Sequence, residues 1–166
     1  MRTTVLVGNP KPGSRTLTVA EDLGRRLSTW AGGEMTTIDL AGYAPRLFDW
    51  QDAEVTALVD ALRASDLAIV ASPTFKASYT GLLKAFLDRI PTNGLAGVVA
   101  VPLMMGAAPI HYLAPEVHLR PVLVEAGACC PTRAIYVQES DLDDLEPVLG
   151  GWFTAHEAVL KRALPA

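Results

Sequence analysis

Apolar residues follow two alternating patterns along the chain. Short apolar runs typical of buried strands occur at five places, and stretches with helical spacing separate them. This alternation predicts an α/β fold: a doubly wound, parallel five-stranded sheet with helices on both faces. The expected strands are Thr4–Val7, Met35–Leu40, Leu67–Ala71, Gly97–Leu103 and Cys129–Val137.

The expected helices have clear beginnings and ends. In the first helix, apolar residues repeat every three or four positions from Leu17 to Leu27, and Gly32-Gly33 ends it. Pro91 stops the third helix. A polar and aromatic loop is expected at Ala41–Trp50. The later helices are expected at Asp52–Ala64, Tyr79–Ile90 and Leu113–Glu125, with a final one after Ser140.

Pro121 lies inside the fourth expected helix. In a regular helix its ring clashes with the carbonyl of Val117 and one hydrogen bond is lost, which costs about 3 kcal/mol. An extra residue in the turn, a π-bulge, relieves such a clash and often marks a functional position. The sequence therefore predicts a wide turn around Val117–Pro121. A simple kink at Pro121 is the alternative.

Composition limits the class of protein. Half of the 166 residues are apolar, which is enough for one domain spanning residues 1–166 with a full core. The net charge is −4, without the excess of Lys and Arg that nucleic-acid binding requires, so we expect no nucleic-acid partner. No segment predicts a membrane span, and three scattered histidines predict no metal site. The adjacent Cys129 and Cys130 are expected in a buried strand and favour a reducing, cytoplasmic location.

The loop after the first strand, Gly8–Thr16, leads directly into a helix. Backbone N–H groups at a helix start and the helix dipole favour an anion there. The hydroxyls of Ser14 and Thr16, the amide of Asn9, and Lys11 or Arg15 can complete a phosphate shell.

Two familiar phosphate motifs do not fit this loop. A Walker loop needs Lys after its second Gly, but Ser14 and Arg15 follow Gly13; the dinucleotide pattern needs Gly where Pro10 stands. A terminal monophosphate fits a single helix start better. The alternative is an ordinary strand–loop–helix turn with a capping Ser14 or Thr16.

In sheets of this kind, ligands bind beyond the carboxyl ends of the strands, where the strand order reverses. The loops that follow the first, third and fourth strands are therefore the candidates for a site. These loops are Gly8–Thr16, Ser72–Ser78 and Met104–His111.

The same three segments resemble a known family. Gly8–Thr16 is similar to the phosphate loop of NADPH-dependent FMN reductases, Ser72–Asp88 resembles their second flavin motif, and Gly106–His111 resembles their third loop, with Ala107 in place of the usual second glycine. Val117–Leu123 is similar to a helix in the reductases of two-component alkanesulfonate monooxygenase systems. Asn9, Lys11 and Phe75 depart from the commoner Ser, Arg and Tyr.

This resemblance implies a flavodoxin-like fold and an NAD(P)H-dependent FMN reductase that supplies reduced flavin to a partner monooxygenase. FMN and NADPH or NADH are the implied cofactors, and because the flavin carries the hydride chemistry, no catalytic side chain is expected. Pro73, Thr74 and Phe75 are expected to wall the ring and offer backbone N–H groups, while Gly106 allows close approach. Lys76 is expected either to contact the pyridine nucleotide or to be a solvated charge. The implied cofactor-binding residues are Asn9, Lys11, Ser14, Arg15, Thr16, Pro73, Thr74, Phe75, Lys76, Gly106 and Ala107.

Two other functions remain open at this point. One is an enzyme that keeps FMN bound and reduces quinones, azo dyes or metal ions; the other is a flavodoxin-type electron carrier. The mild acidity and the small Gly106-Ala107-Ala108 loop favour an enzyme with one open flavin face. The resemblance also implies a homodimer or homotetramer, with His118 in the wide turn facing a neighbouring subunit.

Overall fold

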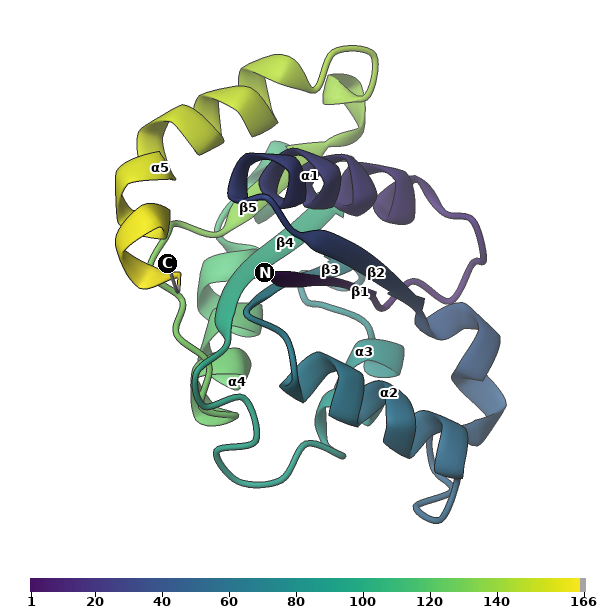
Figure 1. Cartoon of the computed structure of the whole chain (residues 1–166). Coiled ribbons are helices and arrows are strands. Elements are labelled where there is room, and N and C mark those ends of the chain that lie inside the picture. The colour runs from purple at the N-terminus through teal and green to yellow at the C-terminus, as the bar shows by residue number, and fades with distance from the viewer. Residues whose placement is uncertain (165–166) are drawn as a thin grey trace.

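The computed structural model describes residues 1–164 and contains the predicted five-stranded parallel sheet (Figure 1). The strand order is β2-β1-β3-β4-β5, so the chain reverses direction across the sheet between β1 and β3. The doubly wound α/β prediction is therefore confirmed. The strands are β1 (Arg2–Val7), β2 (Glu34–Asp39), β3 (Leu67–Pro73), β4 (Val99–Gly106) and β5 (Ile135–Gln138).

Helices cover both faces of the sheet. Helices α1 and α5 lie on one face and α2, α3 and α4 on the other, each over its own cluster of buried side chains (Figure 1). Every residue of β3 and β4 is buried, which explains why these strands read as continuous apolar runs. The helices are α1 (Arg15–Ala31), α2 (Ala53–Arg63), α3 (Gly81–Leu87), α4 (Arg120–Glu125) and α5 (Gly151–Ala163). None of the helices among residues 1–164 is long and apolar enough to cross a membrane.

The first helix begins and ends as its sequence predicts. The side chain of Ser14 accepts a hydrogen bond from the backbone N–H of Leu17, which is the N-cap interaction. At the other end Gly32 has a left-handed conformation (φ 67°), and its N–H bonds back to the last turn. This helix start therefore has a fixed position directly after β1.

The last strand is shorter than predicted. It begins at Ile135, and Cys129 makes only an isolated bridge to Val99. Pro131 has no N–H to donate to a neighbouring strand. The Arg120 guanidinium donates a hydrogen bond to the Cys130 carbonyl at 2.5 Å, so this carbonyl does not pair in the sheet. Cys129 is consequently exposed and Cys130 half-buried, both as free thiols, so the expectation of two cysteines in a buried strand is wrong.

Three other segments differ from the expected pattern. The segment expected as a loop at 41–50 begins with a 3₁₀ helix, Leu40–Arg46. Helix α3 is shorter than expected at both ends: Thr80 caps its start, its hydroxyl accepting from Leu83 N–H at 3.1 Å, and after Leu87 the chain continues in turns in which Arg89 N–H bonds to the Phe86 carbonyl. A 3₁₀ turn (Glu139–Asp141) and a π-helix (Glu146–Gly150) precede the last helix, which is not capped by Ser140.

A wide turn is present in the fourth helical segment. Residues Pro115–Leu119 form a π-helix, and the N–H of Arg120 bonds to the carbonyl of Pro115, five residues back. Helix α4 follows without a break and has Pro121 in its first turn, where a missing N–H costs little. The predicted wide turn is therefore present, two residues earlier than the expected Val117–Pro121, and the alternative of a regular helix kinked at Pro121 is wrong.

Candidate functional site

The three loops after β1, β3 and β4 surround one cavity at the carboxyl edge of the sheet, with a volume of about 370 Å³. A cavity of this size falls in the range of small-molecule and cofactor sites. All the predicted cofactor-binding residues line it except Lys76. The cavity is lined by Asn9, Pro10, Lys11, Ser14, Arg15, Thr16, Pro73, Thr74, Phe75, Met105, Gly106, Ala107 and Glu139.

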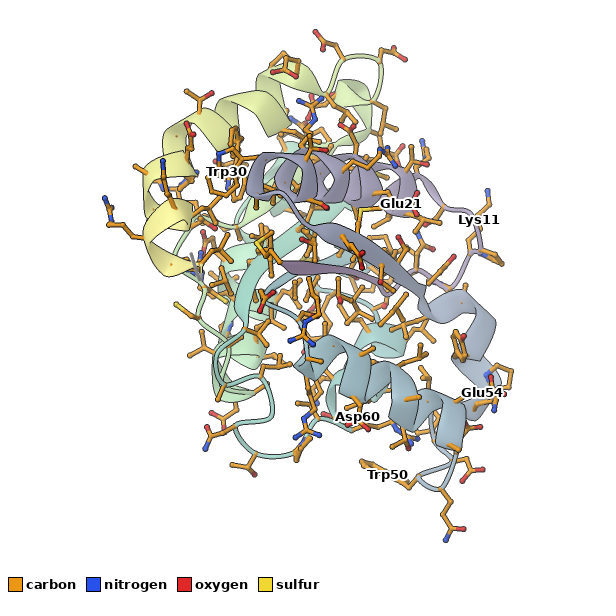
Figure 2. All side chains as sticks on the ribbon, in the orientation of Figure 1. Lys11, Glu21, Trp30, Trp50, Glu54 and Asp60 are labelled. Atoms are coloured by element: carbon orange, nitrogen blue, oxygen red, sulfur yellow. The ribbon has the colours of Figure 1, made fainter. Side chains whose placement is uncertain are left out.

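The first loop is held in shape by its own polar side chains. The Asn9 side-chain NH₂ donates to the Thr16 hydroxyl at 3.1 Å, and the side-chain oxygen of Asn9 (Oδ1) accepts from the Lys11 backbone N–H at 3.0 Å. Ser14 and Thr16 are both buried. Lys11 lies at the outer end of the loop and projects toward solvent (Figure 2). The amide of Asn9 therefore shapes the loop around the Ser14 and Thr16 hydroxyls.

The start of α1 presents unused donors to this cavity. Leu17 N–H bonds to the Ser14 side chain at 3.2 Å, but within residues 1–164 the N–H groups of Arg15 and Thr16 have no backbone or side-chain acceptor. The first turn of α1 contains no acidic residue. Free N–H groups at the positive end of a 17-residue helix form a site for an anion.

An ion pair spans the rim of the cavity. The Arg15 guanidinium lies 2.8 Å from a carboxylate oxygen of Glu139, which directly follows β5. The two side chains are 61% and 38% exposed. Sequence reasoning missed Glu139 because it is 124 positions from Arg15 and belongs to no phosphate motif. Glu139 lies beside the loop Gly8–Thr16, called the anion loop below, only because of the three-dimensional fold.

The second loop is a tight turn under backbone strain. Phe75 and Ser78 exchange backbone hydrogen bonds (2.8 and 3.1 Å), and the two residues between them, Lys76 and Ala77, have left-handed φ angles of 52° and 65°. Such angles cost non-glycine residues about 1–2 kcal/mol each. Strained positions of this kind concentrate at functional sites, and no sequence signal predicted this turn.

The backbone donors expected from this loop are already used. Thr74 N–H bonds to the Met105 carbonyl at 2.7 Å and Phe75 N–H to the Ser78 carbonyl, so neither is free for a ring heteroatom. The expectation that these two amides reach the flavin is wrong in this conformation. Among the described residues, the N–H groups of Ala77 and Ala107 have no such partner.

The third loop is fitted closely to its neighbours. A Cβ atom at Gly106 would lie 2.4 Å from the Tyr136 hydroxyl oxygen and 3.2 Å from Thr74 Cβ. The Tyr136 hydroxyl in turn donates to the Ala108 carbonyl at 2.8 Å, which ties this loop to β5. Glycine is therefore required at 106 by packing, in addition to any approach of a ligand.

One buried polar atom in the cavity wall has no protein partner. The Thr74 hydroxyl oxygen is buried and makes no geometrically acceptable hydrogen bond within residues 1–164, although it lies beside the Tyr136 hydroxyl. Burial raises the pKa of Tyr136, so that hydroxyl stays protonated. Unpaired buried hydroxyls are uncommon in native structures, and this oxygen is covered by neighbouring protein atoms rather than open to the cavity.

Contacts behind the cavity hold the first two loops together. The Thr80 hydroxyl donates to the Gly8 carbonyl at 2.5 Å, and the Ser72 hydroxyl accepts from Thr80 N–H at 3.0 Å. A Cβ atom at Gly8 would lie 2.4 Å from that of Leu83, so α3 packs directly on the first loop. The loops are consequently preorganised.

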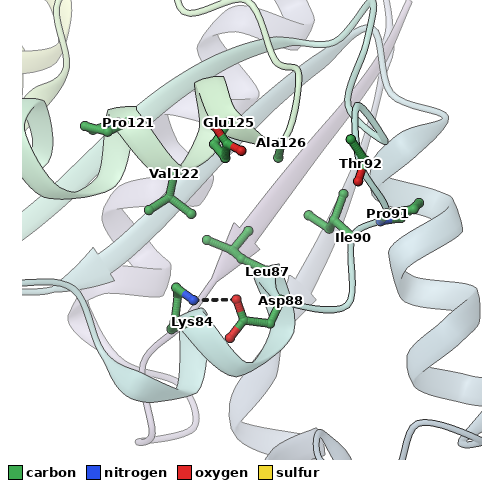
Figure 3. Close-up of a pocket in the computed structure, with 10 residues that line it drawn as sticks. All are labelled: Lys84, Leu87, Asp88, Ile90, Pro91, Thr92, Pro121, Val122, Glu125 and Ala126. Carbon is green, nitrogen blue, oxygen red and sulfur yellow. Dashed lines mark hydrogen bonds and ion pairs between the residues drawn. The ribbon is translucent and has the colours of Figure 1, made fainter.

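A second cavity, of about 400 Å³, lies between α4 and the end of α3 with the segment 88–92 that follows it (Figure 3). Leu87, Ile90 and Val122 line its apolar part, with the Lys84–Asp88 ion pair at one side (Figure 3). This cavity and the cavity formed by the three loops have no lining residue in common. This groove is therefore separate from the site formed by the three loops.

The loop cavity has two features that a flavin mononucleotide requires: anion donors at a helix start, and an apolar wall that includes Pro73 and Phe75. Together with the parallel sheet and its strand order, this defines a flavodoxin-like flavin-binding protein. The chain belongs to the NADPH-dependent FMN reductase family, whose model matches residues 1–141. It is an oxidoreductase that uses FMN and NAD(P)H.

Individual relatives agree with this assignment. The chain is 31% identical over 147 residues to an FMN reductase (NADPH) of Escherichia coli, covering 87% of this chain and 76% of the relative. It is 30% identical over 151 residues to the NADH-dependent FMN reductase SfnF of Pseudomonas fluorescens, covering 88% and 81%.

Solved structures show the same architecture. The apo form of an NADH:FMN oxidoreductase superposes with a TM-score of 0.89 at 30% identity, covering 99% of this chain and 90% of that one. An archaeal flavodoxin superposes with a TM-score of 0.60 at 13% identity, covering 95% and 99%, which shows the shared fold alone.

Proposed function

We propose that this reductase takes up FMN as a substrate, reduces it with NADPH or NADH, and releases the reduced flavin to a flavin-dependent monooxygenase. The observation that carries the proposal is an uncovered slot beside a preorganised anion loop. Phe75 is 52% exposed and Ala107 is exposed, so the described residues leave one side of the slot free for a second substrate. An electron carrier usually covers both flavin faces with aromatic side chains.

The residues divide the work of binding. The free N–H groups of Arg15 and Thr16, the Ser14 hydroxyl and the nearby cations bind the flavin phosphate. Pro73, Thr74 and Phe75 wall the ring. Bound flavin accepts the hydride and supplies the redox chemistry, while the protein sets distance and orientation. We propose that Lys76, in the strained turn, contacts an incoming pyridine nucleotide.

The choice of nicotinamide cofactor and acceptor is proposed from relatives. The relatives described above carry names with NADPH in one case and NADH in the other. SfnF and the alkanesulfonate-type motif at 117–123 support a monooxygenase as the consumer of reduced FMN.

Turnover with free flavin tests this function. We expect the protein to oxidise NADPH or NADH, seen as loss of nicotinamide absorbance, at a rate that saturates with added FMN. Arg15→Gln should raise the KM for FMN by about tenfold or more, since a charge-assisted phosphate contact contributes about 1.5–3 kcal/mol, and leave the KM for riboflavin unchanged. No oxidation above background would refute the proposal. Oxidation that needs tightly bound FMN and a quinone would favour the alternative reductase.

We further propose that copies of the chain associate through the π-helix region. Ile110, Leu113, Val117 and Val124 are large apolar residues that are all more than half exposed in the single chain. His118, the residue after Val117, is also exposed. Val117→Glu should shift the molecular mass measured by light scattering toward that of a monomer. Phe48→Glu, at an apolar residue on a distant element, is the matched control. A monomeric wild-type protein would contradict the proposal.

A further inference from the structure

Glu139 is an unexpected residue in a site for a phosphate. Of the cavity-lining side chains in residues 1–164, it is the only carboxylate. It reaches the cavity from the opposite end of the sequence to the anion loop, directly after β5, and pairs with Arg15 at 2.8 Å. A carboxylate beside a bound phosphate repels it, so its presence needs an explanation.

The ion pair contributes little to the stability of the fold. Both side chains are substantially exposed (61% and 38%), and exposed pairs of this kind are worth little because water screens them and two long side chains must be ordered. The pair also uses one of the five donors of the guanidinium. Arg15 is therefore held only weakly by Glu139 and remains available to a stronger acceptor.

The Glu139 carboxylate binds the guanidinium that a phosphate would bind. A helix N-terminus favours negative charge in its first turn, yet the first turn of α1 contains no acidic residue and begins with Arg15. Glu139, from another element, places a carboxylate on the guanidinium of Arg15 and in the same cavity as this helix start. A phosphate dianion has more charge and three acceptor oxygens, so it competes effectively for the same guanidinium.

We propose that Glu139 sets the affinity of this site for phosphorylated flavin by competing with the phosphate for Arg15. This inference rests on the proposed function of releasing reduced FMN. Glu139 lowers the net charge of the cavity's three charged side chains from +2 to +1, counting Lys11, Arg15 and Glu139. Oxidised and reduced FMN both bind less tightly as a result and leave between turnovers, and riboflavin, which has no phosphate, is unaffected.

The test is a pair of binding titrations on full-length protein, with FMN and with riboflavin, followed by flavin fluorescence. Glu139→Gln should bind FMN about three- to tenfold more tightly at low salt, and the gain should shrink as ionic strength rises. Riboflavin affinity should stay the same. Glu146→Gln is the matched control, because Glu146 pairs with Arg26 on the same helix α1 and lies outside the cavity.

A double variant tests whether Glu139 lowers FMN affinity through Arg15. Glu139→Gln should increase FMN affinity in the Arg15→Gln background by less than half of the fold-increase that it produces in the wild type. The reason is that Arg15, the group for which Glu139 and the phosphate compete, is absent. Weaker FMN binding by Glu139→Gln would overturn the inference and make Glu139 a residue that positions Arg15. An equal change for riboflavin would also overturn it. Wild-type protein that binds no FMN would instead refute the proposed function.

Discussion

Replacing Gly106 with alanine tests how closely the third loop is fitted. The new Cβ would lie 2.4 Å from the Tyr136 hydroxyl oxygen, closer than real Cβ contacts, so that hydroxyl must move. Tyr136 is only 6% exposed and donates to the Ala108 carbonyl, so moving it breaks a partly buried hydrogen bond. Losing that bond costs about 1 kcal/mol, and overpacking a core adds about 1–3 kcal/mol.

We therefore expect Gly106→Ala to lower the free energy of unfolding by about 2–4 kcal/mol, measured by urea denaturation. For a chain of this size that is a fall in Tm of about 5–15 °C. Gly42→Ala is the control, because a Cβ atom at Gly42 meets no atom within 4 Å. It should change stability by less than about 1 kcal/mol.

A double variant separates the steric clash from other causes. Tyr136→Phe removes the atom that the new methyl group meets, so Gly106→Ala should cost about 1–2 kcal/mol less in the Tyr136→Phe background than in the wild type. Strictly additive effects of the two substitutions would refute the reasoning, because they would show that the Tyr136 hydroxyl is not what excludes a side chain at 106.

The remaining predictions concern the second loop and the π-helix. Ala77→Gly should raise the free energy of unfolding by about 0.5–1 kcal/mol, because glycine adopts φ 65° without strain; unchanged or lower stability in urea would contradict this. Burial raises the pKa of Glu116, but hydrogen bonds from Arg120 and from the Ala134 N–H outweigh it and hold the pKa below the ordinary 4.5. The stabilisation from ionised Glu116 is therefore present above pH 4.5 and lost as pH falls below it. The free energy of unfolding, measured by urea titration at pH 6 and at pH 3.5, should fall less between these pH values in Glu116→Gln than in the wild type. An equal fall in the two proteins would contradict this assignment.

Much of the fold follows from local pattern. Strands β3 and β4 are buried along their whole length, so apolar residues alone identify them, and helix α1 carries both a capping Ser14 and a terminal Gly32. The wide turn near Pro121 was also predictable, because proline's ring and missing N–H conflict with a regular helix. These features depend on residues close in sequence.

Features that depend on long-range contacts were not predictable. Cys129 and Cys130 are apolar enough for a strand, but hydrogen bonds from Arg120 draw the nearby backbone carbonyls away from the sheet. The Thr74 N–H bonds to Met105 in continuation of the β3–β4 pairing, and the Phe75 N–H is used by a turn with two left-handed residues that no sequence motif predicts. Glu139 reaches the anion loop only because β5 ends beside it.

The central claim is that the start of α1 binds the phosphate of FMN. A crystal structure of the protein with FMN tests it most directly. We predict the phosphate within hydrogen-bond distance of the Arg15 and Thr16 N–H groups and the Ser14 hydroxyl, with the ring between Pro73–Phe75 and Gly106. FMN bound with its phosphate away from Ser14, or a first loop too narrow to admit an anion, would contradict the account.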